Sequence, residues 1–304
     1  MVGIASVNGS GVNYVAWNWK ANGGTTTTND ASATSVGTID SVYQANTTAG
    51  FSIVTYTGTG SNDTFAHGLG VAPTMIIHKR RDDAQHWVIY HVGIGNTRSV
   101  LFNTDAQNSA SAVNFNNTSP TSTVFSLGTD AYANASGGTY VAYCFADVEG
   151  YSKFGSYTGN GDNNGTFVFT GFRPRYVLLK TASLGSQYWN IFDSERDPFN
   201  DQASSPLYAN VTDAEGNGNV DIDLLSNGMK MRDSGNNHNS SGHTYIYLFA
   251  NESGELITSL DCKFLNETHL SPSGDQTPMY ACFAQDTGFG YVTLASICTP
   301  GTVN

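Results

Sequence analysis

The feature that most constrains the fold of this chain is a seven-residue signature, Asn-x-Ser-Gly-x-x-Tyr, which occurs three times, each time directly before an alternating apolar strand. Because a turn and the strand that follows it are duplicated together, the chain is a repeat protein, and repeat proteins are typically modular scaffolds. The copies and their strands are Asn8–Tyr14 with Val15–Trp19, Asn134–Tyr140 with Val141–Phe145, and Asn239–Tyr245 with Ile246–Ala250.

A second internal match recurs after about a hundred residues, independently of the signature. The stretch Thr55–Gly60 matches Ser156–Gly161, and further along Trp87 matches Trp189. This self-alignment reduces three signatures to two complete domains. The expected organisation is an orphan closing strand of an upstream repeat in 1–20, an extended connector in 21–50, repeat domains in 51–150 and 151–250, and a C-terminal β cap or assembly element in 251–304.

The composition favours β-structure. Charged residues make up only 12% of the chain, 33 residues are Gly, and Asn, Ser and Thr are abundant, which favours turns and pleated surfaces over helices. No segment shows helical periodicity, and the apolar runs are short and bounded by turn residues. The sequence therefore predicts an all-β fold with two tandem β-sandwich or jelly-roll-like repeat domains. The expected strands are Phe51–Tyr56, Thr74–Arg80, His86–His91, Ser99–Asn103, Thr123–Leu127 and Thr139–Phe145 in the first repeat, and Phe154–Tyr157, Phe167–Phe169, Arg175–Thr181, Trp189–Asp193, Leu207–Asn210, Val220–Leu224, Met229–Arg232 and His243–Phe249 in the second.

The first signature copy precedes a strand, Val15–Trp19, that has no domain body in front of it. Two interpretations are open. The sequence is the C-terminal part of a longer array, or this strand completes a sheet in a neighbouring subunit by strand addition. Residues 21–50 are rich in Thr, Asn and Gly and indicate an extended connector.

Residues 251–304 do not continue the repeat, and a divergent end unit is what a repeat array needs to cap its last interface. Strands are expected at Leu256–Leu265, Met279–Phe283 and Phe289–Ile297. The four cysteines include no C-x-x-C pair that would indicate zinc. Buried free thiols are the main interpretation, and one bridge within the terminal trio is the alternative. The cysteines are Cys144, Cys262, Cys282 and Cys298.

Charge and hydropathy exclude two classes of partner. The formal net charge is −12, from 25 acidic against 13 basic residues, and phosphate binding needs a basic face, so nucleic acid is not expected. No run approaches the roughly 20 apolar residues of a membrane-spanning helix, and the N-terminus lacks the pattern of a signal peptide. Membrane insertion is therefore not expected.

Four histidines between His67 and His91 invite a test for a metal site. His86 and His91 are five positions apart, so they point to opposite faces of a regular strand. The second repeat has no histidines at the matching positions. We expect no metal and no cofactor.

The densest group of acids is Asp193-Ser-Glu195-Arg-Asp197, and paired carboxylates are typical of glycosidases. The first repeat carries no acid there, and Arg196 supplies a counter-charge, which favours a solvated turn. Trp87 and Trp189 are repeated with their strands, which indicates core packing or an aromatic platform for sugars. No catalytic residue is expected, and the candidate recognition residues are Trp87, Trp189, Asp193 and Glu195.

Several stretches together resemble a repeat module found in structural proteins of tailed bacteriophages, particularly marine and cyanobacterial ones. They are Tyr14–Lys20 with the following Ala-Asn-Gly-Gly, Gly50–Gly58, and His67–Pro73. The resemblance covers roughly residues 8–250 and supplies no functional residues. It implies a tail fibre, spike or other virion-surface protein, extracellular and homo-oligomeric, often trimeric, whose loops meet the host envelope.

The sequence thus predicts a non-enzymatic virion structural protein, a tail fibre or receptor-binding appendage at the virion surface. Its expected partners are other virion structural proteins and a host surface glycan or receptor. The loops that differ between the repeats, Asn103–Ser122 and Asp197–Ser205, are the expected recognition elements. Two alternatives remain: a capsid-decorating or tail-connecting protein without host contact, and a polysaccharide-degrading spike that uses Asp193, Glu195 or Asp197.

Overall fold

A computed structural model describes residues 15–110, 112–198, 200, 205–216 and 222–251, and three short strands at 261–262, 282–285 and 291–292. The chain divides into two compact units, Met1–Glu252 and Ser253–Asn304. Strands account for 38% of the structure and helices for 5%, in several antiparallel sheets, which confirms the predicted all-β sandwich class. Among the described residues, no helix is long and apolar enough to cross a membrane.

The first part of the larger unit, residues 27–145, is called module 1 below. Its large sheet has the order β1-β2-β3-β10-β5-β6-β7-β8, and a small sheet pairs β4 with β9. The strands are β1 Thr27–Asn29, β2 Ser41–Asn46, β3 Phe51–Thr57, β4 Asp63–Ala66, β5 Met75–Arg80, β6 Val88–His91, β7 Arg98–Leu101, β8 Ser109–Ala110, β9 Val124–Leu127 and β10 Thr139–Phe145, with short helices α2 Ala31–Thr34, α3 Ala112–Phe115 and α4 Ala131–Asn134.

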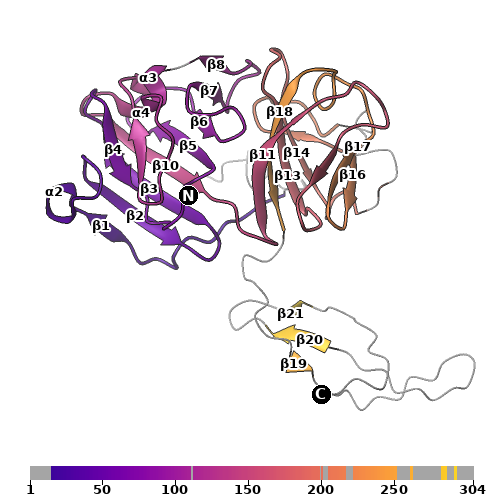
Figure 1. Cartoon of the computed structure of the whole chain (residues 1–304), viewed down its shortest axis with the longest axis horizontal. Helices are drawn as coiled ribbons and strands as arrows, with labels where there is room; N and C mark the ends of the chain where they lie inside the picture. The colour runs from indigo at the N-terminus through magenta and orange to yellow at the C-terminus, as the bar shows by residue number, and fades with distance from the viewer. Residues whose placement is uncertain are drawn as a thin grey trace, which may run out of the picture. The chain divides into compact units, whose positions relative to one another are not determined.

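Residues 152–250 form module 2. Its large sheet has the order β11-β18-β13-β14-β15, the same order as β3-β10-β5-β6-β7 in module 1, and its small sheet has the order β12-β17-β16. The structure therefore repeats one antiparallel design twice (Figure 1). The strands are β11 Ser152–Thr158, β12 Phe167–Phe169, β13 Tyr176–Thr181, β14 Trp189–Asp193, β15 Leu207–Tyr208, β16 Ile222–Leu225, β17 Gly228–Met231 and β18 Thr244–Ala250.

The two modules are joined through a core that neither could bury alone. Successive side chains of a strand point to opposite faces, and in β18 both faces are covered. Tyr245, Tyr247 and Phe249 pack inside module 2, whereas Ile246 and Leu248 pack in a cluster shared with module 1. We call this cluster the inter-module core. Its buried members are Ala21, Phe51, Met75, Ile89, Val100, Phe145, Phe154, Leu178, Ala182, Trp189, Ile191, Ile246, Leu248 and Ala250.

Strand β10 shows the same division in module 1. Tyr140, Ala142 and Cys144 face the internal core of that module, and Tyr143 and Phe145 pack against the inter-module core. The two large sheets therefore face each other, and each also carries a small sheet on its other side, so the larger unit is a stack of four β-layers. Burial of a large apolar side chain stabilises by about 1.5–3 kcal/mol, so the inter-module core is a substantial part of the fold.

The prediction of an extended connector in residues 21–50 is wrong for residues 27–46. Strand β2 pairs with β3 along its whole length, from Ser41 opposite Tyr56 to Asn46 opposite Phe51. Before it, α2 is capped by Asp30, whose carboxylate accepts hydrogen bonds from two backbone N–H groups of the first turn. Segment 27–46 therefore belongs to module 1.

The prediction of a strand at Val15–Trp19 is also not met, since residues 15–20 form no strand in the described structure. Trp17 instead lies 5.3 Å from the ring of Tyr176, and Trp19 lies 5.2 Å from Tyr176 and 6.1 Å from Phe145. The two half-buried indole rings pack against the inter-module core, and this contact holds the segment without strand pairing. The upstream array and the neighbouring subunit stay predictions.

The unit Ser253–Asn304 contains a three-stranded sheet, β19-β20-β21. Its register places Cys262 directly opposite Cys282, while Cys298 and most of the predicted strands Leu256–Leu265, Met279–Phe283 and Phe289–Ile297 lie outside the described residues. A bridge within the terminal trio stays a prediction. The strands are β19 Asp261–Cys262, β20 Cys282–Gln285 and β21 Tyr291–Val292.

Candidate functional site

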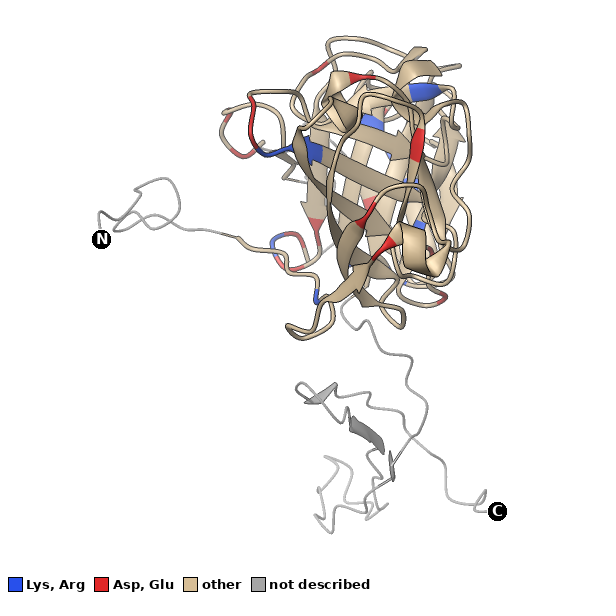
Figure 2. Ribbon diagram, turned by 90° about the vertical axis from the view of Figure 1, so that its left-hand side faces the viewer, with Lys and Arg blue, Asp and Glu red and all other residues tan. Residues whose placement is uncertain are grey.

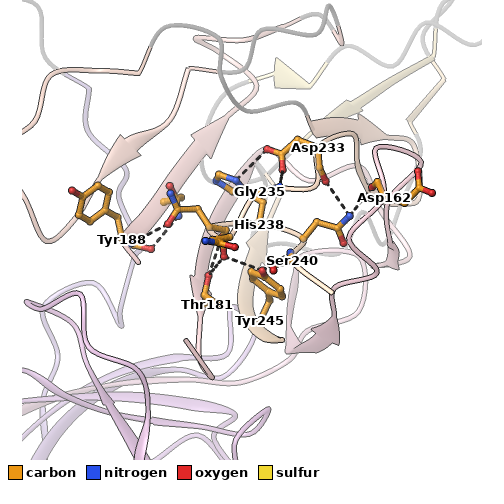
Figure 3. A network of polar contacts seen from close by, with 12 residues as sticks. Asp162, Thr181, Tyr188, Asp233, Gly235, His238, Ser240 and Tyr245 are labelled. Carbon is orange, nitrogen blue, oxygen red and sulfur yellow. Dashed lines mark hydrogen bonds and ion pairs between the residues drawn. The ribbon is translucent and has the colours of Figure 1, made fainter. Parts of the chain in front are cut away.

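The repeated signature builds a polar network at one end of module 2 (Figure 3). The side-chain amide of Asn239 donates to Asn160 Oδ1 at 2.7 Å, to the Asp162 carbonyl at 2.8 Å and to the Asp233 carbonyl at 3.0 Å. Its Oδ1 accepts the N–H of Asn160 at 3.1 Å. One buried amide therefore ties the loop after β11 to the loop before β18.

Module 1 uses the same device. Asn134 donates to the carbonyls of Gly128, at 2.8 Å, and Ser61, and its Oδ1 accepts the N–H of Thr59 at 2.9 Å. Both asparagines are 0% exposed. The Asn of the signature is therefore a structural lock, since a buried amide must satisfy its hydrogen bonds within the protein.

The Tyr of the signature completes the lock. Tyr140 accepts the Ala135 N–H and donates to the Ala131 carbonyl, both at 2.7 Å, and Tyr245 makes the equivalent pair with Ser240 and Asn236. Each ring also stacks on the tyrosine directly opposite it on the paired strand, β3 or β11, with centroids 5.2 Å and 4.9 Å apart. Burial raises the pKa of Tyr245 to about 12, so it remains a hydrogen-bond donor at neutral pH. The stacked pairs are Tyr56 with Tyr140 and Tyr157 with Tyr245.

The network contains a His–Asp pair, a combination that also occurs in catalytic sites. His238 Nδ1 lies 3.3 Å from Asp233 Oδ2. His238 is buried, and its Nε2 has no hydrogen-bond partner among the described residues. The imidazole packs edge-on against Phe192, with centroids 5.9 Å apart. A general base needs a hydrogen-bonding path to a nucleophile or water, and no described residue supplies one at Nε2.

The acids predicted near β14 are held in a turn. Asp193 is 3% exposed, and its carboxylate accepts the N–H groups of Glu195 and Arg196 and pairs with Arg196 Nε at 2.7 Å. In module 1 the ring Nδ1 of His91 accepts the Gly93 N–H at 3.0 Å in the same way. The duplication therefore retains a hydrogen-bond acceptor at this turn, a histidine in module 1 and an aspartate in module 2.

Glu195 is exposed and pairs with Arg175 at 3.0 Å. The third acid, Asp197, accepts the Ser205 N–H at 2.7 Å. Each of the three carboxylates is thus tied to a different neighbour. These contacts hold the loop in place. Asp193 and Glu195 each pair with a different arginine and do not face each other as the two carboxylates of a glycosidase would.

The two tryptophans have different environments. Trp189 is 1% exposed within the inter-module core, and its indole N–H donates to the Leu101 carbonyl at 3.0 Å. A buried ring cannot offer a platform to a sugar, so the prediction of Trp189 as a recognition residue is wrong. Trp87 is half-buried and stacks on Tyr143 with centroids 6.5 Å apart, and it remains a recognition candidate.

Three of the predicted histidines are buried separately. Burial lowers the pKa of His67 and His91 to about 4 and that of His78 to about 3, so all three are neutral at pH 7. Each has its own partner, respectively the Thr121 carbonyl, the Tyr247 carbonyl and the Tyr56 hydroxyl. Over the described part of the chain, no three His, Cys, Asp or Glu residues gather as metal ligands would.

Two further reactive groups are buried. Cys144 is a free thiol whose pKa is raised by desolvation, so it is not a nucleophilic thiolate at neutral pH. Desolvation lowers the pKa of Lys180 to about 8, and its ammonium donates to the carbonyls of Gln187 and of Asp105 in module 1. Lys180 therefore binds one module to the other.

The predicted recognition loop Asn103–Ser122 divides in two. Its first half is engaged by module 2, since the Asn108 N–H donates to the Ala182 carbonyl at 2.7 Å. Its second half, 116–122, is largely exposed, and Asn116 and Asn117 both have positive φ. The other loop, Asp197–Ser205, lies largely outside the described residues.

Fold and contacts together define a class of protein, a double β-sandwich fused into one body. The family model of DUF7483, a domain of unknown function, matches residues 2–253, and the chain belongs to this family. The match spans both modules as one domain, in agreement with the compact unit Met1–Glu252. No curated protein and no solved structure matches the chain significantly.

Proposed function

We propose that the chain is a non-enzymatic structural protein of a bacteriophage virion, a tail fibre or receptor-binding appendage that contacts the host surface. The sequence resemblance to phage structural modules supports this proposal. The structural observation that carries it is the inter-module core, which fuses two sandwiches into one body. Such a body suits a load-bearing part that holds loops at fixed positions.

The burial of the histidines and of Lys180 also supports a role as a scaffold. His67, His78 and His91 are neutral and buried, and Lys180 joins the modules. Charged residues are scattered over the ribbon, most of which is uncharged (Figure 2). The described ion pairs, such as Arg175 with Glu195, connect neighbouring loops and strands.

Host recognition then falls to exposed loops with adaptable hydrogen-bonding groups. Segment 116–122 has the sequence Asn-Asn-Thr-Ser-Pro-Thr-Ser and is largely exposed in module 1. Amide and hydroxyl groups of this kind suit a surface glycan. Half-buried Trp87 adds an aromatic face elsewhere on the same module.

The test is adsorption of the purified chain to cells of the bacterium that the virus infects. The double variant Asn116→Gly with Asn117→Gly removes two amides and keeps positive φ accessible. We expect it to lower cell binding at least tenfold with an unchanged melting temperature, whereas Asn163→Gly, in an exposed loop of module 2, should bind normally. Unchanged binding by the double variant contradicts host recognition through this loop.

Antibody labelling of virions separates the appendage from the alternative. Labelling at the tail supports the proposal, and labelling spread over the capsid supports a decorating protein. Release of new reducing ends from host glycan by the purified chain would overturn the non-enzymatic assignment.

A further inference from the structure

Strand β12 is an open edge of the small sheet of module 2. It pairs only with β17, in the order β12-β17-β16. The Met231 N–H donates to Thr166 O and the Thr170 N–H to Asn227 O, so the even-numbered residues of this segment face β17. The backbone groups of Phe167 and Phe169 therefore face outward, and no described residue hydrogen bonds to them.

The equivalent strand of module 1 is covered. Phe65 of β4 points into its core as Val168 of β12 does, which aligns Thr64 with Phe167 and Ala66 with Phe169. The Thr64 carbonyl accepts the N–H groups of Thr38 and Ile39 at 2.8 and 3.2 Å, and the Thr64 N–H donates to Thr38 Oγ1 at 2.8 Å. The Ala66 carbonyl accepts the hydroxyl of Ser41 at 3.0 Å. Segment 38–41 thus closes in module 1 the edge on which no described residue of module 2 forms a hydrogen bond.

The edge strand of the large sheet of module 2, β11, is partly capped by side chains from adjacent segments of the chain. The Phe154 N–H donates to the Asp147 carboxylate at 3.0 Å, and the Thr158 carbonyl accepts the Thr166 hydroxyl at 2.9 Å. No described residue caps the outer edge of β12 in this way. Its two outward phenyl groups are also exposed, at 42% for Phe167 and 64% for Phe169. Unprotected edges with apolar side chains are sites of strand pairing.

We propose that β12 pairs with β12 of a second copy of this chain, antiparallel about a two-fold axis at Val168. Phe167 of one copy then lies opposite Phe169 of the other. All outward N–H and C=O groups of these residues are satisfied, and the two small sheets become one. The four phenyl groups form cross-strand pairs on one face.

The symmetry of its open backbone groups favours a second copy as the occupant, although the overall charge of the chain opposes association. The chain carries a net charge of −12, so two copies repel each other through most approaches. The β12 edge is uncharged, and its open groups are symmetric about Val168. A two-fold interface requires such a self-complementary patch. This inference is independent of a virion role.

Light scattering on the full chain tests the pairing. We expect a dimer that Phe169→Lys dissociates, with dimer affinity weakened at least tenfold, because a charge at a strand edge blocks pairing. Val71→Lys is the matched control, since Val71 is 50% exposed in module 1, and it should leave the dimer intact. A wild-type chain that stays monomeric at about 100 µM, or an oligomer that survives Phe169→Lys, overturns the proposal.

Cross-linking tests the register. Phe167→Cys and Phe169→Cys chains are prepared separately and mixed under oxidising conditions. A hydrogen-bonded antiparallel pair has a Cα separation of about 5.5 Å, which a disulfide can bridge. We expect a cross-linked dimer in the mixture beyond any band that the native cysteines give in either variant alone. Equal cross-linking in all three samples contradicts the register.

Discussion

Modules 1 and 2 share their hydrogen-bond geometry and differ in their side-chain chemistry. In both, a buried Asn and Tyr lock the loop before the closing strand. In both, the backbone N–H of the repeated tryptophan, Trp87 just before β6 or Trp189 at the start of β14, donates to an Asn side chain, Asn103 or Asn210. Yet one turn acceptor is His91 and its counterpart is Asp193. A position that keeps its hydrogen-bond geometry while its side chain changes has a structural role in both modules.

The largest expected difference between the modules is their response to acid. The folded-state pKa values of His67, His78 and His91, all in module 1, lie near 3–4, below the unfolded value of 6.5. Below pH 6.5 the unfolded chain therefore binds more protons, and stability falls as pH falls from 6.5 to about 4. We expect a loss of about 2 kcal/mol per histidine at pH 5.

Amide hydrogen exchange at pH 7 and pH 5, corrected for intrinsic rates, measures this difference residue by residue. Amides in β4, β5 and β9 of module 1 should lose more protection than those in β12, β16 and β17 of module 2. Equal losses in both modules would mean that the buried histidines do not govern the acid response.

The two repeated tryptophans give the next largest contrast. Trp189→Ala removes an indole from the inter-module core and leaves a cavity, with an expected loss of about 4 kcal/mol. Trp87→Ala removes a half-buried ring stacked on Tyr143, with an expected loss of about 1 kcal/mol. Denaturant unfolding of both variants measures the difference, and similar losses would contradict the inter-module core.

Strong alternation or unbroken apolar runs allowed the sequence to predict most strands of the two modules. Trp189–Asp193 and Phe167–Phe169 have the predicted bounds, because every β14 residue is buried and turn residues bound both strands. The sequence could not show that a second module covers one face of β14. A strand buried on both faces has the same apolar sequence pattern whichever element covers it. This is why Trp189 was open to interpretation as a surface platform.

Strands β2 and β4 were not predicted, because their residues are half polar. Ser41–Asn46 reads Ser-Val-Tyr-Gln-Ala-Asn and has only partial burial over most of its length, so pairing with β3 stabilises it more than apolar burial does. The sequence identified the signature as a repeated turn, but it did not predict that its Asn and Tyr side chains hold distant loops together. Only the structure shows that the Asn amide reaches a loop more than 70 residues away, the one after β3 or the one after β11.

The lock itself is the third point of comparison. Asn134→Ala and Asn239→Ala each leave several loop carbonyls without their donor, and we expect each to cost about 2 kcal/mol. Similar losses would show that the lock has equal weight in both modules. Asn163→Ala, on the exposed tip of the module 2 loop, is the control and should stay within about 0.5 kcal/mol of the parent.

The smallest effect is expected at Glu195, whose counterpart in module 1 is a glycine. Module 1 has Gly93 at this point of the turn, and its backbone N–H donates to His91 Nδ1. In module 2 the N–H of Glu195 makes the equivalent bond to Asp193, while its exposed carboxylate only pairs with Arg175. Because an exposed ion pair contributes about 0–1 kcal/mol, Glu195→Ala should change the free energy of unfolding by less than about 0.5 kcal/mol and leave cell binding unchanged. A large loss of binding with normal stability would instead identify Glu195 as a contact to the host.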